Sequence, residues 1–184
     1  DKEKIVMTTE AALDHLKRQF SSAVLTESHF LGETTVAVDK VQIKELLTSL
    51  RDEQGYAILT DLSGIDYLYP TKHTCIFYLL QNPSNDERIR LTVTVEREES
   101  LPSITTLWKA ADWFERELYD LFGVHFEGHP DIKRILMPDD WIGHPLRRDY
   151  ALTEEPVAFK HGVEPKIPSQ TIPFIPYEKK NKKF

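Results

Sequence analysis

The chain has 184 residues, a length typical of one domain, with 30 acidic and 23 basic residues and a formal charge of -7. This balance argues against nucleic acid as the main partner, because phosphate binding needs a surplus of lysine and arginine on one face. The only cysteine, Cys75, excludes an internal disulfide and an iron–sulfur cluster held by four thiolates of this chain, and we expect it to pack in the core.

No stretch approaches the roughly 20 apolar residues of a membrane span, and residues 1–4, Asp-Lys-Glu-Lys, do not resemble the start of a signal peptide. We therefore expect a hydrophilic protein that is made in the cytoplasm. Any association with a membrane is expected to depend on partner proteins.

The first predicted elements are a helix and a hairpin. A helix is expected from about Thr8 to Phe20, where apolar residues recur at helical spacing after a threonine cap. Residues 23–25 and 34–38 are typical of two short strands, and Gly32 lies between them as a turn. The two strands are predicted to form a hairpin.

A second helix is predicted after Asp39, a favourable N-cap residue, with Gln42 three residues later to complete a capping box. Its buried stripe comprises Ile43, Leu46, Leu47 and Leu50. The helix is expected to end before Gly55.

Three strands follow, at residues 56–62, 74–81 and 89–96. The last strand alternates apolar with polar residues and is expected to be buried on one face. The turn-forming residues 82–85 predict that the last two strands form an antiparallel pair, while Gly64 and Asp66 are interpreted as another turn.

A third helix is predicted from about Ser103 to Phe122, where Gly123 is a suitable C-terminal cap. The order of elements, α-β-β-α-β-β-β-α, predicts an α+β fold in which helices pack on a largely antiparallel or mixed sheet. Residues 151–184 hold five of the eleven prolines and are expected to be an irregular, proline-rich C-terminal extension. We divide the chain into an α/β domain (1–126), an interaction segment (127–150) and this extended tail (151–184).

The flanks of the third helix are predicted to face a partner, because they carry tryptophan, tyrosine and glutamate beside the apolar stripe. The flanking residues are Trp108, Trp113, Glu115, Glu117 and Tyr119. Arg116 lies opposite the stripe and is spaced to pair with Asp112 and Asp120, one turn away on either side.

The segment after this helix repeats a His-Pro dipeptide, at His129-Pro130 and His144-Pro145, and continues as Arg147-Arg148-Asp149-Tyr150. A residue before proline is held extended, so each imidazole has a defined orientation and can pin the segment by a hydrogen bond. The adjacent guanidinium groups suit carboxylates, either of a partner or of Glu115 and Glu117. We predict that these residues contribute to a subunit interface.

A metal-dependent hydrolase is the alternative interpretation of the histidines. His125, His129 and His144 could form a ligand set with nearby aspartates, but the four-residue spacing of the first two requires a helix. Gly128 and Pro130 make a helix there unfavourable. The sequence also contains no GxGxxG, phosphate loop or nucleophile elbow, so no nucleotide site is predicted.

Taken together, the end of the third helix and the segment after it resemble the 30 kDa subunit (C-type) of respiratory complex I. The resemblance is carried by residues 115–123, 128–131, 134–136 and 143–150, with weaker support from residues 61–67. The α/β domain of that family also agrees with the order of elements predicted above.

The resemblance implies a proton-translocating NADH:quinone oxidoreductase, in which this chain is a hydrophilic part of the peripheral arm near the quinone chamber. The implied partners are the D-type and B-type proteins of complex I, together with other members of the peripheral arm. The implied location is peripheral, on the cytoplasmic side of the cell inner membrane or on the matrix side in a mitochondrion.

The resemblance also implies that FMN, iron–sulfur clusters and quinone are bound in partner subunits. Because this chain has one cysteine and no nucleotide motif, we predict that it holds no cofactor and has a scaffolding role. Related subunits serve in membrane-bound hydrogenases and in dehydrogenases with other donors, so the resemblance leaves the electron donor open, as it does the quinone and the bacterial or organellar source. A stand-alone metal-dependent hydrolase is the alternative of a different class.

Overall fold

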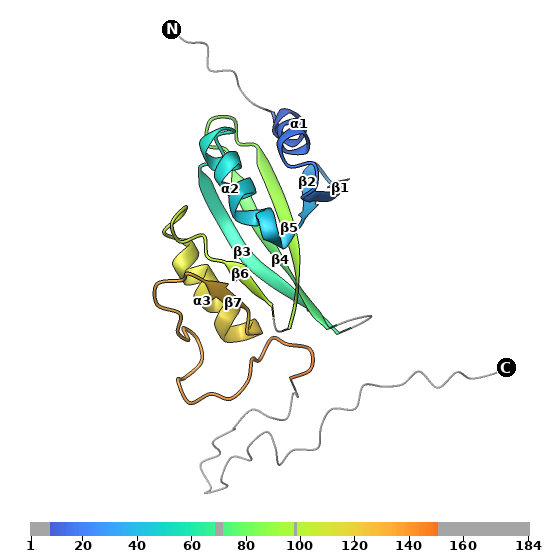
Figure 1. Cartoon of the computed structure of the whole chain (residues 1–184). Helices are drawn as coiled ribbons and strands as arrows, with labels where there is room; N and C mark the ends of the chain where they lie inside the picture. Colours follow the sequence, from blue (N-terminus) through green and yellow to red (C-terminus); the bar gives the residue numbers. More distant parts are fainter. Residues whose placement is uncertain (1–7, 69–71, 98, 151–184) are drawn as a thin grey trace, which may run out of the picture.

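The computed structural model describes residues 8–68, 72–97 and 99–150, so the predicted tail at 151–184 lies outside the described residues. The helices are α1 (Thr9–Gln19), the short 3-10 helix η1 (Lys40–Gln42), α2 (Ile43–Asp52) and α3 (Ala111–Phe122). The strands are β1 (Val24–Phe30), β2 (Glu33–Val38), β3 (Ile58–Tyr67), β4 (His73–Gln81), β5 (Arg88–Glu96), β6 (Ser100–Pro102) and β7 (His125–Glu127). Figure 1 shows α2 lying across a long sheet, with α3 and β7 beside the far end of β3.

The main sheet has five strands in the order β1-β2-β5-β4-β3. Neighbouring strands are antiparallel except β2 and β5, which run parallel. The parallel pair arises because the chain leaves β2 through α2 and then forms the β3, β4 and β5 meander, whose last strand returns beside β2. The predicted α+β class is therefore confirmed, as are the β1–β2 hairpin and the antiparallel β4–β5 pair.

The helices cover one face of this sheet. Along β4 and β5 every second residue is buried, and Ile76, Tyr78 and Leu91 are fully enclosed in the core. The predicted apolar stripe of α2 is buried against this face. Cys75 lies on the opposite face of β4 and is half-buried instead of packing in the core, although burial still raises the pKa of its thiol.

The helix starts are partly as predicted. Thr8 is the N-cap of α1. Asp39 also acts as a cap, but it caps η1, where its carboxylate accepts the Val41 N–H at 2.8 Å. The predicted capping box with Gln42 is wrong, because the Asp39 N–H that it requires donates to Ala23 O at 2.8 Å.

The turn predicted at Gly64 and Asp66 is wrong, since both residues lie inside β3. Gly64 pairs with Ile76 of β4, and a Cβ atom at Gly64 would lie only 3.1 Å from Cδ2 of Leu118 in α3. The close approach of α3 to the strand explains this glycine better than a turn does.

Helix α3 begins at Ala111, eight residues later than Ser103, where the sequence predicted its start. Residues 100–102, just before the predicted start, form β6, which pairs in parallel with β7. The Ser103 N–H then donates to Glu127 O at 2.8 Å. Residues 105–107 and 109–110 form turns, so the chain is not helical between Ser103 and Ala110, where helical spacing alone predicted a helix.

Candidate functional site

The segment of residues 128–150 passes around α3 without helix or strand over its whole length, and we refer to it as the wrap segment (Figure 1). A segment of this length must satisfy its backbone polar groups by other means. It does so through charged side chains, several of which belong to the motifs that carry the family resemblance.

Asp120 in α3 organises the middle of the wrap segment. Its Oδ2 accepts the backbone N–H groups of Ile135, Leu136 and Met137 at 3.1, 2.7 and 2.8 Å, and its Oδ1 lies 2.6 Å from Nη1 of Arg134. The side chain is fully enclosed, at 0% exposure. Burial opposes ionisation, but these donors outweigh it and hold the pKa of the Asp120 carboxyl below its ordinary value.

Arg134 connects two distant parts of the wrap segment. Besides Asp120, its guanidinium donates to Trp141 O at 2.9 Å and to Gly143 O at 3.0 Å. The Arg134 side chain therefore links its own part of the wrap segment both to α3 and to the part around Trp141. A planar guanidinium with five donors is suited to such a junction.

The end of α3 is closed by side chains of the wrap segment. Gly123 ends the helix in the left-handed region at a φ of 71°, as predicted. The His144 ring is placed with Nδ1 2.9 Å from Asp120 O, and the Arg147 guanidinium donates to Phe122 O at 2.5 Å and to Gly123 O at 3.2 Å. These contacts satisfy carbonyl groups that a helix leaves without partners at its C-terminus.

This closure leaves no room for a larger residue at Gly123, where a Cβ atom would overlap the side chains of Arg147 and His144. Burial lowers the pKa of His144, and the nearby Arg147 and Arg134 act in the same direction. The imidazole is therefore neutral near pH 7 and suited to a structural hydrogen bond.

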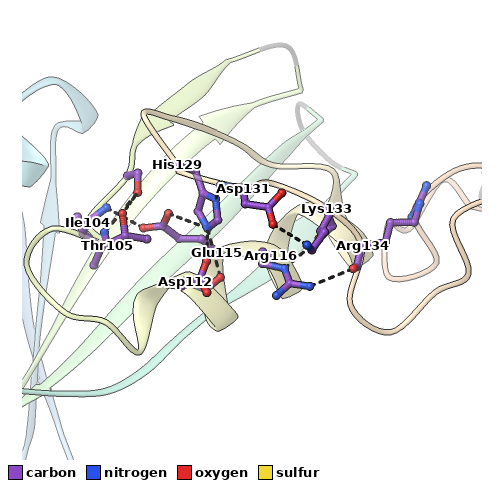
Figure 2. A network of polar contacts seen from close by, with 10 residues as sticks. Ile104, Thr105, Asp112, Glu115, Arg116, His129, Asp131, Lys133 and Arg134 are labelled. Carbon is purple, nitrogen blue, oxygen red and sulfur yellow. Dashed lines mark hydrogen bonds and ion pairs between the residues drawn. The ribbon is translucent and has the colours of Figure 1, made fainter.

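A second polar cluster lies at the start of α3 (Figure 2). The buried carboxylate of Glu115 accepts the Ile104 N–H at 2.7 Å. The fully enclosed His129 ring places Nε2 3.1 Å from Oδ1 of Asp112 and 4.0 Å from Oε2 of Glu115. Burial raises the pKa of Glu115, although the hydrogen bond from the Ile104 N–H acts in the opposite direction.

The predicted ladder of Asp112, Arg116 and Asp120 along α3 is wrong. Each carboxylate binds a residue of the wrap segment, His129 or Arg134, as described above. Arg116 donates to the carbonyl groups of Lys133 and Arg134 at 3.2 and 3.3 Å, and its guanidinium lies 5.0 Å from the centre of the Trp113 ring. The predicted pairs between these three side chains along α3 are therefore not formed, because each side chain contacts the wrap segment.

The last residues of the wrap segment are fixed to the main sheet. Asp66 of β3, which is almost fully enclosed, pairs with Arg97 at 2.6 Å and accepts the Arg148 N–H at 2.8 Å. Asp149 lies 3.4 Å from both Arg97 and Lys72. Sequence reasoning did not identify Asp66 and Arg97 as site residues, because nothing local to either residue indicates a partner 31 positions away.

The predicted interface residues divide into buried and exposed groups. Trp108 and Glu115 are buried within this chain, and the Trp108 indole N–H donates to Ala57 O at 2.9 Å. Trp113 and Glu117 are exposed, and Tyr119 is half-buried. In the wrap segment the side chain of His129 is enclosed, and His144, Pro145, Arg147 and Tyr150 are half-buried. Pro130, Arg148 and Asp149 are exposed. The partner-facing role predicted for the set as a whole stays a prediction.

The three histidines of the alternative metal site do not converge. His129 faces Asp112 and Glu115, while His144 faces the carbonyl of Asp120. His125 lies edge-on to Tyr119, with ring centres 5.7 Å apart. Within residues 8–68, 72–97 and 99–150, no three His, Cys, Asp or Glu side chains are grouped as metal ligands. The geometry therefore gives no support to the hydrolase interpretation.

Residues 36–156 match the model of the family described as respiratory-chain NADH dehydrogenase, 30 Kd subunit. The chain belongs to this family. The resemblance inferred from the end of α3 and the wrap segment is thereby confirmed, and the match extends back through most of the main sheet to β2.

Curated relatives agree with this assignment. The NADH-quinone oxidoreductase C subunit of Citrifermentans bemidjiense is 46% identical over 142 residues, covering 77% of this chain and 88% of the relative. The corresponding C subunit of Roseiflexus castenholzii is 42% identical over 158 residues, covering 84% and 91%. As a member of the family, this chain is a subunit of an NADH:quinone oxidoreductase complex.

A solved structure supports the fold. A chain in the structure of the membrane-bound sulfane sulfur reductase, an archaeal respiratory membrane complex, matches with a TM-score of 0.68 and 18% identity, covering 78% of this chain and 85% of that one. At this identity the likeness concerns the fold alone. None of the helices in the described ranges is both long and apolar enough to span a bilayer.

Proposed function

We propose that this chain is a non-catalytic, cofactor-free scaffolding subunit in the peripheral arm of a proton-translocating NADH:quinone oxidoreductase. Its partners are the D-type and B-type proteins of that complex near the quinone site. FMN, the iron–sulfur clusters and quinone belong to partner subunits, and the chain lies on the cytoplasmic side of the inner membrane. Family membership supports the part of the proposal that concerns the complex.

One observation carries the scaffolding role: the polar motif is used to build the chain's own shape. Asp120, Arg134, His144 and Arg147 bind backbone groups and one another across the contact between α3 and the wrap segment. Acid–base and nucleophilic centres are built from such residue types. In this chain the polar groups of these four residues form hydrogen bonds that hold an irregular segment in place. This arrangement favours a role in presenting a fixed surface to neighbouring subunits.

Purification from native membranes tests this proposal. A tagged full-length chain is expressed in its source cell, the complex is released with mild detergent, and co-purifying proteins are identified by mass spectrometry after chemical cross-linking. We expect the NADH-oxidising subunits to be recovered, and cross-links to connect this chain with the D-type and B-type proteins. If the recovered complex lacks an NADH-oxidising subunit and contains a hydrogenase instead, the proposed electron donor is wrong.

The cofactor-free role has its own test on the purified chain. Absorbance spectroscopy and elemental analysis are expected to find no bound flavin and no stoichiometric iron or zinc. A tightly bound flavin, cluster or metal at one equivalent per chain would contradict the proposed role.

A further inference from the structure

The turn between β1 and β2 has an unusual sequence for its conformation. Leu31 and Gly32 form a two-residue loop, closed by the pairing of Phe30 with Glu33, and both have a positive φ, of 49° and 81°. Two such angles are typical of a type I′ turn, in which asparagine or aspartate followed by glycine is preferred. A leucine in the left-handed region brings its Cβ atom close to a backbone carbonyl oxygen, so Leu31 costs folding free energy that asparagine would avoid.

The apolar side chains at this turn lie in solvent. Phe30 is 75% exposed and Leu31 is 87% exposed, more than any other large apolar residue in the part of the chain that the structure describes. Side chains so exposed make few contacts with their own chain and add little to the core. Single exposed apolar residues are common on proteins, but here an exposed leucine also occupies a strained backbone position. Strain that the fold does not require points to a function for the side chain.

A groove with an acidic lining lies beside the turn. Its volume is about 770 Å³, and Leu31 and Gly32 form part of its wall. The start of α1 and the loop between β4 and β5 supply other parts of the wall. The acidic and arginine residues of the lining are Glu10, Glu33, Asp86, Glu87 and Arg88. Because these residues border the same groove as Leu31, four carboxylates and one guanidinium determine much of the charge beside the apolar turn.

Ion pairs along the hairpin leave this excess of negative charge in place. The hairpin forms one edge of the main sheet, beside α1 (Figure 1). Arg90 pairs with Glu33 at 2.6 Å, and Glu27 lies 2.5 Å from Lys17 and 2.6 Å from Nε2 of His29, which also lines the groove. With these partners included, the region holds five acidic residues against three lysine and arginine residues, Lys17, Arg88 and Arg90. The turn is therefore apolar and its surroundings are acidic.

We infer that Phe30 and Leu31 insert into an apolar pocket of another protein subunit of the same complex, and that a lysine or arginine beside that pocket enters the acidic groove. This inference rests on the proposed function. Both side chains protrude from a tight turn, so a flat surface would cover them on one side only, whereas a pocket would desolvate them fully, as strong interface contacts require. The opposite charges would fix the orientation of the contact. Phe30 and Leu31 lie outside residues 36–156, so the family match alone does not imply this contact.

Two other occupants fit the charges less well. An anionic lipid surface attracts an excess of lysine and arginine, whereas acidic residues are in excess around the turn. A second copy of this chain would bring the acidic region of one copy toward that of the other in a two-fold contact, which is unfavourable. The groove of a second copy is also a poor site for Phe30 and Leu31, because its charged lining would lose water without gaining polar partners.

Leu31→Asn tests the inference, because it changes stability and docking in opposite directions. Asparagine suits the left-handed region, so the melting temperature of the isolated chain is expected to rise by about 2–4 °C. Incorporation into the complex is expected to fall, because the apolar side chain is lost. The control is Val41→Asn in η1, beyond the other end of β2, where the side chain is 74% exposed. If Leu31→Asn instead lowers the melting temperature, Leu31 serves the fold and the inference is wrong.

Incorporation is measured by competition. Each full-length variant is expressed in its source cell together with a wild-type copy that carries a different tag, and mass spectrometry gives the ratio of the two chains in the purified complex. We expect Leu31→Asn to be about tenfold under-represented, which corresponds to about 1.4 kcal/mol of binding free energy. Val41→Asn is expected to compete equally with the wild type. Equal competition by Leu31→Asn overturns the inference.

The charge of the groove has its own pair of variants at Glu10, an exposed residue of the groove lining. Glu10→Lys is expected to compete less well than Glu10→Gln, because a lysine in the groove repels the basic side chain of the partner. Thermal unfolding of both chains separates this effect from a change in the stability of α1. If the two variants compete equally, the partner is not basic and the inference is wrong on that point.

A contact measurement complements competition. A photo-activatable benzophenone amino acid, which is similar in shape to phenylalanine, is placed at position 30 of the full chain. We expect it to cross-link to another subunit of the complex, whereas the same group at position 41 is not expected to do so. A cross-link from position 30 that stays within the same chain, or no cross-link at all, overturns the inference.

The remaining outcomes identify another occupant. Self-association of the isolated chain that disappears in Leu31→Asn would make the turn a contact between two copies. Binding to vesicles of phosphatidylglycerol that disappears in this variant would make it a lipid contact. Either result overturns the inference while leaving the proposed function intact. If the wild-type chain itself recovers no subunit of an NADH:quinone oxidoreductase, the proposed function fails and the inference fails with it.

Discussion

A single carboxylate, that of Asp120, holds three consecutive backbone N–H groups of the wrap segment and one arginine. The arrangement is similar to an anion-binding nest of successive N–H groups, with the anion supplied by the chain itself. Because the carboxylate has no exposed surface, its loss leaves both the N–H groups and Arg134 without their acceptor. Removing one partner of a buried pair costs far more than an exposed pair contributes.

Asp120→Ala is therefore expected to lower the free energy of unfolding by about 3–5 kcal/mol. The control is Asp131→Ala, whose carboxylate lies on the surface and pairs with Lys133. It should leave stability nearly unchanged. Chemical denaturation followed by circular dichroism measures both, and equal effects would show that the buried contacts of Asp120 are not a main support of the wrap segment.

The C-terminal end of α3 shows how an element depends on a distant segment. Arg147 and Arg148 are neighbours in sequence and were predicted together as interface residues, but their surroundings differ. The Arg147 side chain binds the carbonyl groups of Phe122 and Gly123, whereas the contact of Arg148 with Asp66 is made by its backbone N–H, which any residue but proline supplies.

The two arginines predict different results when each is replaced. Arg147→Ala leaves carbonyl groups at the end of α3 without donors and is expected to cost about 1–3 kcal/mol of stability. Arg148→Ala keeps the backbone contact, and we expect its free energy of unfolding to lie within about 0.5 kcal/mol of the wild-type value. Thermal melts of the two variants side by side test this, and an equal loss of stability would contradict the assignment of Arg147 to the helix end.

At the scale of the whole molecule, the buried acids respond to pH in opposite directions. The pKa of Glu115 is raised above the ordinary 4.5, so its contribution to stability is present below pH 4.5 and is lost as pH rises through the folded-state pKa. The pKa of Asp120 is lowered below 3.8, so its contribution is present above pH 3.8 and is lost as pH falls through the folded-state pKa. The lowered pKa of His144 adds a loss of stability as pH falls below 6.5.

Measured unfolding free energies of wild type and variants between pH 3 and pH 8 should separate these effects. The stability advantage of wild type over Glu115→Gln is expected to grow as pH falls from 7 toward the ordinary pKa of 4.5. The advantage over Asp120→Asn is expected to shrink below the ordinary pKa of 3.8. If the free energies of unfolding of both variants change with pH in parallel with that of the wild type, neither carboxyl has a pKa shifted by the fold.

Local patterns in the sequence predicted much of the fold. The stripes of α2 and β5, the Thr8 cap and the Gly123 cap were found because each depends on residues within one or two turns or along one strand. The late start of α3 was missed, since β6 is held by β7, far along the chain, and the Ile104 N–H is bound by Glu115. Helical spacing predicts where a helix can form, but tertiary contacts decide where it does.

The sequence by itself determined the family, the α+β class and the segment that matters, because residue types, order and hydrophobic periodicity are properties of the chain alone. Only the tertiary structure decided that His129, Arg134, His144 and Arg147 of that segment turn toward α3 and that Leu136 and Ile142 remain exposed. The contact of Asp120 with Arg134 spans 14 positions and that of Asp66 with Arg97 spans 31. Whether a side chain points toward α3 or toward solvent depends on which distant groups meet after folding, and no local pattern carries that information.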